Sequence, residues 1–249
     1  PSADVVLAAI RAADHGRGVI LGYGNYAGDV LNFGLAAQLA EAEGIVVREI
    51  RVADDVASAP PEQADRRRGI AGDIIVFKVA GAAAERGDSL DDVMRLAAAA
   101  NAATHSMGIA LSACEVPGSG GPTFELGPGE IEIGMGVHGE PGIRRGPLRP
   151  ADELAGVLVD AIVDDIGAAR GAVALLVNGL GATAHLDQYI LYRGARRALE
   201  AHGFDVARSY VGEYITSLEM SGASLTVTVL DAELTALLDA PARTVRIER

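Results

Sequence analysis

One histidine, His138, lies in a loop made almost entirely of small residues. It belongs to the segment Met135-Gly-Val-His-Gly-Glu-Pro-Gly142, which follows an alternating, strand-like run. The glycines around it are Gly134, Gly136, Gly139 and Gly142. A neutral imidazole nitrogen is a nucleophile near neutral pH. An isolated histidine is more often a buried, hydrogen-bonded one, but the absence of bulk here predicts a ring, beside Glu140, that a small polar ligand can approach.

A second glycine-bearing turn, Gly22-Tyr-Gly24-Asn-Tyr-Ala-Gly28, lies between a predicted strand and a predicted helix. A dinucleotide-binding fingerprint needs that context, but the GxGxxxG spacing is too long for its usual form. Asp29 follows, where a carboxylate stabilises the start of a helix and repels a pyrophosphate. Asp29 is therefore either an N-cap or a carboxylate at the ligand-binding edge of a parallel sheet.

The remaining candidates favour structural roles. Asn178-Gly-Leu-Gly-Ala-Thr183 predicts a tight turn with Thr183 as the N-cap of the next helix. Cys114 is expected to be a small buried residue. The other histidines are expected at helix ends or on helix faces; they are His15, His105, His185 and His202. No His/Cys/Asp cluster has metal-ligand spacing, so no metal is expected, and the sequence contains neither GxxxxGK[ST] nor a serine elbow.

Composition narrows the class of protein. The chain has 249 residues, is 49% hydrophobic and carries a formal net charge of -13. An acidic chain without a basic face argues against nucleic-acid binding, and Arg66-Arg67-Arg68 is interpreted as a solvated helix start. No apolar run is long enough to span a bilayer, and no signal peptide is present. With the single Cys114, these features predict a cytoplasmic protein without an internal disulfide.

Hydrophobic periodicity predicts alternating strands and helices. Expected strands are 18–23, 45–52, 73–79, 107–113, 130–137, 173–177, 206–211 and 224–230. Expected helices are 3–14, 30–42, 81–85, 88–103, 151–166, 186–202 and 232–238, with loops over 54–65, 116–129 and 143–150. The early alternation predicts a parallel sheet covered on both faces by helices. The fold class is α/β in two domains: a three-layer α/β/α domain with a parallel sheet over 1–112, and a mixed-sheet α/β domain over 113–249.

Segments along the whole chain resemble the K subunit, the substrate-binding part, of dihydroxyacetone kinases. The matching segments are Asn25-Tyr-Ala-Gly-Asp-Val-Leu-Asn-Phe33, Asp54-Asp-Val56, Arg67-Arg-Gly-Ile-Ala-Gly72, Gly81-Ala-Ala-Ala-Glu85, Pro122-Thr-Phe-Glu-Leu126, Gly136-Val-His-Gly-Glu-Pro-Gly-Ile143, Leu176-Val-Asn-Gly-Leu-Gly181, Thr216-Ser-Leu-Glu-Met-Ser-Gly222 and Leu238-Asp-Ala-Pro241.

The resemblance implies a mechanism. His138 attacks the ketone carbon of a short-chain ketose and holds it as a covalent hemiaminal, which excludes glycerol because glycerol has no carbonyl group. Asp29 hydrogen-bonds the terminal hydroxyl, with Gly24, Gly28 and Gly139 beside the substrate. The phosphoryl group comes from ATP or ADP with Mg on a separate L domain or subunit, directly or through a phosphoenolpyruvate relay. The family is typically homodimeric.

The sequence departs from the family pattern in its N-terminal part. The Gly-rich GGGSGHEP segment, whose histidine is implied to be the general base, is absent, and the chain begins at Pro1 without a methionine. We expect that segment to lie outside this sequence, to be a separate piece, or to be missing from a protein that is not a competent kinase. Because the chain ends soon after Pro241, no fused L domain is expected.

A second departure concerns substrate choice. Members that use dihydroxyacetone often carry lysine where this chain has Gly24. Its loss removes a donor and leaves room, which predicts that a four-carbon ketose such as erythrulose is accepted. Two further classes are alternatives: a non-catalytic ketose-binding regulatory paralogue, and a dinucleotide-dependent oxidoreductase that uses Gly22–Gly28.

Overall fold

The computed structural model describes residues 1–114, 118 and 120–248. Its helices are α1 (Ala3–Ala13), α2 (Ala27–Ala42), α3 (Gly72–Arg86), α4 (Leu90–Ala102), α5 (Ala151–Ile166), α6 (His185–Ala201) and α7 (Ala232–Asp239), with a 3-10 helix, η1 (Pro61–Arg66). Its strands are β1 (Val19–Gly24), β2 (Val47–Val52), β3 (Thr104–Ala110), β4 (Glu130–Ile133), β5 (Arg144–Pro147), β6 (Gly171–Gly179), β7 (Phe204–Gly212) and β8 (Gly222–Val229).

The strands form a parallel pair and a larger mixed sheet, which confirms the predicted α/β class. β1 and β2 pair in parallel, whereas the six-stranded sheet has the order β5-β4-β3-β8-β6-β7. Only β6 and β7 are parallel within the larger sheet; its other pairs are antiparallel. β3 precedes residue 112 and yet pairs with β8, so it does not extend the parallel pair. The domain division at that residue stays a prediction.

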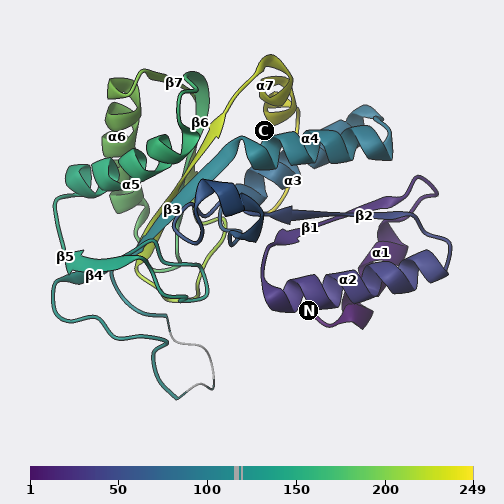
Figure 1. The fold of residues 1–249 in the computed structure, drawn as a ribbon, viewed down its shortest axis with the longest axis horizontal. Helices are drawn as coiled ribbons and strands as arrows, with labels where there is room; N and C mark the ends of the chain where they lie inside the picture. Colours follow the sequence, from purple (N-terminus) through teal and green to yellow (C-terminus); the bar gives the residue numbers. More distant parts are fainter. Residues whose placement is uncertain (115–117, 119, 249) are drawn as a thin grey trace.

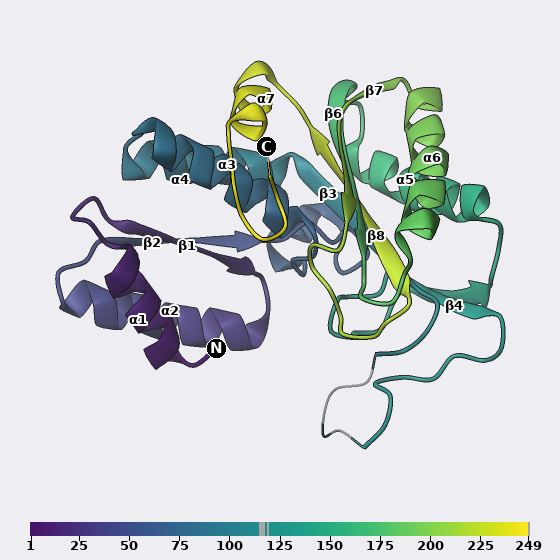
Figure 2. The same ribbon diagram turned by 180° about the vertical axis from the view of Figure 1, so that it is seen from behind.

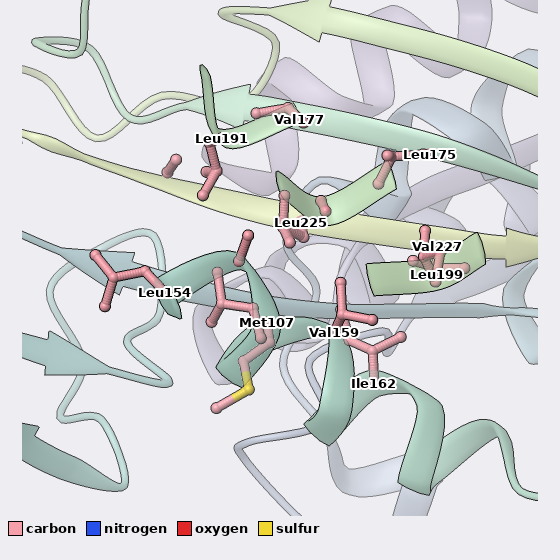
Figure 3. Packing of buried hydrophobic residues seen from close by; sticks show 14 of the residues in the cluster. Met107, Leu154, Val159, Ile162, Leu175, Val177, Leu191, Leu199, Leu225 and Val227 are labelled. Carbon is pink, nitrogen blue, oxygen red and sulfur yellow. The ribbon is translucent and has the colours of Figure 1, made fainter. Parts of the chain in front are cut away.

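Helices α3 and α4 lie between the two sheets. Figures 1 and 2 show α1 and α2 on one side of the β1–β2 pair and α3 and α4 on the other. A single buried cluster contains Ile50 of β2, Ile75 of α3 and Leu176 of β6. The opposite face of the larger sheet packs against α5 and α6, where Leu175, Val159 and Leu199 interdigitate (Figure 3). Since each fully buried aliphatic side chain contributes about 1.5–3 kcal/mol, this shared packing fixes one sheet against the other.

The predicted strand 73–79 is wrong, because these residues belong to α3. Ile75, Val79 and Ala83 are all buried at helical spacing. The Asp54 carboxylate accepts hydrogen bonds from the backbone amides of Ile70 and Gly72 at the start of the helix. Gly87, with φ 91, ends it in the left-handed conformation. The β-branched run favoured a strand locally, but packing on both sides and these end contacts decide for a helix.

A strand was also missed. Residues 143–150, predicted to be a loop, contain β5, which pairs with β4 at the edge of the larger sheet. Its burial is slight, so it carries no hydrophobic alternation that the sequence could reveal. The pairing holds the chain that returns from His138 against β4.

Candidate active site around His138

A tight turn presents His138 to solvent. After β4 the backbone turns at Gly134, whose φ is 79. The Gly139 amide then donates to the Gly136 carbonyl at 3.2 Å, with Val137 and His138 between them. The Val137 side chain is buried, whereas the His138 side chain is 63% exposed. Val137 therefore anchors the turn in the core, and the imidazole of His138 points to solvent.

Glu140 orients this imidazole. Its Oε2 accepts from the His138 backbone amide at 3.0 Å, and its Oε1 lies 3.1 Å from His138 Nδ1. Burial alone would raise the pKa of Glu140, but the hydrogen bonds from His138 and the backbone outweigh it and hold that pKa below its usual value. An ionised carboxylate only accepts, so Nδ1 carries the proton and Nε2 the lone pair. Nε2 has no hydrogen-bond partner among the described residues.

The charge around the ring makes it more basic. The hydrogen bond to Glu140 raises the pKa of His138 above its usual value against partial burial, and the charges of Glu140 and Asp29 act in the same direction. Asp29 is half-exposed in the first turn of α2. The structure thus brings His138 and Asp29 within electrostatic reach of each other. The N-cap position of α2 belongs to Tyr26, so the interpretation of Asp29 as an N-cap is wrong.

Tyr26 links the two segments. Its ring stands edge-on to the His138 ring, with centroids 4.5 Å apart. Its hydroxyl donates to the Gly69 carbonyl at 2.9 Å. The neighbouring Asn25 donates through Nδ2 to the Arg67 carbonyl at 2.8 Å. The turn after β1 is therefore fastened to the segment before α3, and Tyr26 lies against the imidazole.

The glycines of the histidine loop serve close packing, which corrects the expectation that they leave open space. A Cβ on Gly136 would overlap the Glu140 carboxylate, and one on Gly142 would overlap the Ile133 carbonyl. On Gly139, whose φ is 84, it would lie 2.6 Å from Thr123 Oγ1. Of the β1–α2 glycines, Gly28 has open space beside it, whereas a Cβ on Gly24 would meet the Tyr26 ring at 3.2 Å.

An arginine that the sequence analysis assigned to solvent holds the site together. Arg68 donates to Asp55 through Nε at 2.8 Å and to the Gly134 carbonyl through Nη2 at 3.0 Å. Burial raises the pKa of Asp55 to about 7 although the charge of Arg68 lowers it. This pair joins the end of β2 to the start of the histidine loop.

The interpretation of 66–68 as a solvated helix start is also wrong at its middle residue. Arg67 is buried, and its Nη1 donates to Asp165 Oδ2 at 2.8 Å. Asp165 also contacts His105 Nδ1 at 2.6 Å, and His105 lies on β3 rather than on a helix. The sequence signal for a structural role of these arginines was their place in the Arg67–Gly72 motif. Their basic side chains alone favour an exposed position.

The motif segments converge beneath the loop. One buried cluster contains Ile70, Val137, Leu180 and Met220, with Tyr26 and Phe124 packed against it. Cys114 belongs to the same cluster, as expected for a small buried residue. Thr183 is not the N-cap of α6, because Ala184 holds that position; its Oγ1 instead donates to the Gly222 carbonyl at 2.6 Å.

Other features of the described chain lie away from this site or add no metal chemistry. A cavity of about 1030 Å³ between α3 and the C-terminal segment is lined by Phe77, Leu237 and their neighbours, and includes neither His138 nor Asp29. Within the described residues, no group of His, Cys, Asp and Glu side chains is placed to hold a metal ion. No helix in that part of the chain is long and apolar enough to cross a membrane.

The comparisons with known proteins place these features in a family. Residues 1–246 match the model of the Dak1 domain. The chain belongs to the Dak1 domain family. An L-erythrulose 1-kinase of Mycolicibacterium smegmatis is 46% identical over 249 residues, covering 98% of this chain and 44% of that protein. A dihydroxyacetone-binding subunit DhaK of a PTS-dependent dihydroxyacetone kinase from Listeria innocua is 44% identical, covering 98% of this chain and 73% of that protein.

A solved kinase structure confirms the fold. The dihydroxyacetone kinase of C. freundii, in complex with AMP-PNP and Mg2+, superposes with a TM-score of 0.85 at 35% identity. That alignment covers 95% of this chain and 43% of the solved chain. The chain thus spans less than half the length of this kinase and of the M. smegmatis relative.

Proposed function

We propose that this Dak1 chain is the substrate-binding part of a dihydroxyacetone-type kinase and captures a short-chain ketose covalently on His138. The observation that carries the proposal is the orientation and exposure of the imidazole. Glu140 holds Nδ1, so Nε2 presents its lone pair at an exposed position. Kinase relatives that are named for dihydroxyacetone and erythrulose support the choice of a ketose.

In the capture step, a bond forms between Nε2 and the ketone carbon while the carbonyl π bond breaks and its electron pair moves to oxygen. The ring then carries a positive charge, and its Nδ1 proton lies on the hydrogen bond to Glu140. Transfer of that proton to Glu140 and on to the alkoxide gives a neutral hemiaminal. Glu140 thus acts both as the orienting group and as the proton acceptor, and no external reactant is consumed.

Asp29 is proposed to hydrogen-bond the hydroxyl that receives the phosphoryl group. Phosphoryl transfer is largely a problem of position and charge, so a ketose fixed at its carbonyl carbon needs little more than an oriented terminal hydroxyl. The nucleotide, ATP or ADP with Mg, is assigned to an L domain or L subunit. Gly24, Gly28 and Gly139 line the substrate in this proposal, which also includes a cytoplasmic homodimer and a domain division near residue 112.

A four-carbon ketose is the second candidate substrate. The relative from M. smegmatis is named for erythrulose, and this chain has Gly24 where a lysine is expected from a dihydroxyacetone-specific member. The space beside Gly24 is limited, because the Tyr26 ring already lies close to it. A preference for the larger ketose therefore needs a polar contact as well as space.

Intact mass spectrometry of the full-length protein tests the capture step. After incubation with dihydroxyacetone or erythrulose, without borohydride, we expect the protein mass to increase by one ketose, and glycerol to add nothing. His138→Ala abolishes the increase, whereas His185→Ala, at an exposed histidine of α6, keeps it. An unmodified wild-type protein, or an adduct that survives in His138→Ala, contradicts the proposal. Adduct formation without phosphorylation in the presence of an L partner and nucleotide indicates the regulatory alternative.

A further inference from the structure

The Asp73 carboxyl group has no hydrogen-bond partner among the described residues. It lies in the first turn of α3, and its Oδ1 is buried without a hydrogen bond. Among the described residues, the other buried side-chain atom in this condition is Oε1 of Gln188. A buried polar group left unpaired costs about 1–3 kcal/mol, so such groups often await a ligand or a water. Neither the capture step nor the resemblance assigns Asp73 a role.

The surroundings of Asp73 favour its neutral form. Burial, together with the negative charges of Asp54 and Asp29, raises the pKa of Asp73 to about 8. The Asp54 oxygens are occupied by the amides of Ile70 and Gly72. The Asp73 carboxyl therefore keeps its proton at neutral pH, and can donate a hydrogen bond to an oxygen atom outside the protein.

The second oxygen of this carboxyl, Oδ2, lies beside Gly24. A Cβ placed on Gly24 would lie 3.6 Å from Asp73 Oδ2 and 3.2 Å from the Tyr26 ring. The Tyr26 ring in turn contacts His138. The Cβ position of Gly24 therefore lies beside both the Asp73 carboxyl and the Tyr26 ring. Any side chain at position 24 would occupy the space beside the Asp73 carboxyl and the Tyr26 ring.

We infer that Asp73 is a specificity-determining residue whose carboxyl group donates a hydrogen bond to the additional hydroxyl of a four-carbon ketose held on His138. The inference rests on the proposed function, since His138 must first fix the carbonyl carbon. It explains why a glycine precedes Asn25: the missing side chain lets the longer ketose reach Asp73. Dihydroxyacetone is one carbon and one hydroxyl shorter, and gains less from this contact.

The test compares the capture of erythrulose and dihydroxyacetone by the wild-type protein, Asp73→Ala and Asp73→Asn, with bound fractions measured by intact mass spectrometry. We expect Asp73→Ala to weaken erythrulose capture on the order of tenfold, the loss of one hydrogen bond, and dihydroxyacetone capture much less. Asp73→Asn keeps a neutral donor of similar shape and stays closer to the wild type. Because the Asp73 carboxyl bonds no described residue, neither change leaves another group of that part of the chain unpaired.

Gly24→Ala provides a second variant if Asp73→Ala fails to fold. The added methyl group obstructs the path to Asp73, so erythrulose capture falls more than dihydroxyacetone capture. Equal losses for both ketoses, or unchanged capture in both variants, overturn the role of Asp73 while capture on His138 stands. If the wild-type protein captures neither ketose, the proposed function fails, and the assignment of Asp73 falls with it.

Discussion

The Tyr26 ring meets the His138 ring edge-on, at a centroid distance of 4.5 Å and an interplanar angle of 81°. These residues come from the turn after β1 and the loop after β4, so the contact joins the parallel strand pair to the larger sheet. Aromatic pairs in this geometry contribute about 0.5–1.5 kcal/mol beyond their buried area. The contact limits rotation of the imidazole.

Truncation of Tyr26 is expected to free the imidazole. Tyr26→Ala removes both the ring contact and the hydrogen bond to Gly69, and ketose capture by His138 falls about tenfold as orientation is lost. Tyr26→Phe keeps the ring and lowers the free energy of unfolding by about 1 kcal/mol through the lost hydrogen bond. Adduct formation and denaturant unfolding measure the two effects. Equal capture by the Ala and Phe variants contradicts a role for the ring.

Glu140→Gln is expected to shift the pH dependence of capture. The nucleophile is neutral His138, so the capture rate falls as pH drops through the pKa of His138, which Glu140 raises. Without that charge the pKa of His138 decreases and the acid limb moves to lower pH, while the maximal rate decreases because the Nδ1 proton loses its acceptor. Histidine NMR titration and capture rates across the acid and neutral range check both shifts, with the exposed Glu125→Gln as control. An unmoved acid limb refutes the assignment.

The same pair links stability to pH. A raised His138 pKa means that the folded state binds the proton more tightly, so this contribution is full below the unfolded pKa and disappears as pH rises through the folded value. The lowered Glu140 pKa contributes in the opposite sense: it stabilises above the unfolded pKa and is lost as pH falls through the folded one. We therefore expect Glu140→Gln to be most destabilising in the weakly acidic range, between the two titrations. Thermal unfolding against pH shows whether the difference from wild type peaks there.

Arg68→Met is expected to destabilise the protein by about 3 kcal/mol, because it leaves Asp55 buried without its cation. Burial already raises the pKa of Asp55 to about 7, so ionisation of this carboxyl destabilises the folded state. Removing Arg68 raises that pKa further. The free energy of unfolding of the variant therefore falls further below that of the wild type as pH increases through neutrality.

Urea unfolding at several pH values measures this deficit. Arg66→Met is the matched control, since Arg66 is exposed and bonds only the Gln63 side chain in the described chain; its change should stay within about 0.5 kcal/mol. Similar losses of stability in the two variants indicate that the Arg68 contacts do not stabilise the loop.

Gly142→Ala tests the packing of the histidine loop. A methyl group there overlaps the Ile133 carbonyl, so the loop must shift, and both stability and capture decrease. Gly146→Ala is a matched control nearby on β5, where a Cβ meets nothing within 4 Å. We expect a destabilisation of about 1–3 kcal/mol for Gly142→Ala and almost none for Gly146→Ala. The idea that these glycines only provide room predicts the reverse, a normal fold with blocked capture.

Local patterns predicted most elements and the central residue of the site. Strands at 18–23 and 173–177 and the helix at 151–166 were found because alternation and helical spacing are encoded in neighbouring residues. The segment 73–79 was misassigned because a short apolar run of β-branched residues fits a strand and a buried helix equally well. Its helical state depends on Asp54 and on packing between two sheets.

What the sequence by itself determined is therefore the α/β alternation, the glycine-bounded His138 turn and the candidate pair of His138 and Asp29. The tertiary structure decided what surrounds them. Arg68 reaches a carbonyl 66 residues away at Gly134, and Asp73 comes to face Gly24 only when α3 packs beside β1. Such contacts join segments distant in the chain, and no local propensity encodes them. They follow from the burial of α3 between two sheets, which places buried charges where only particular partners can satisfy them.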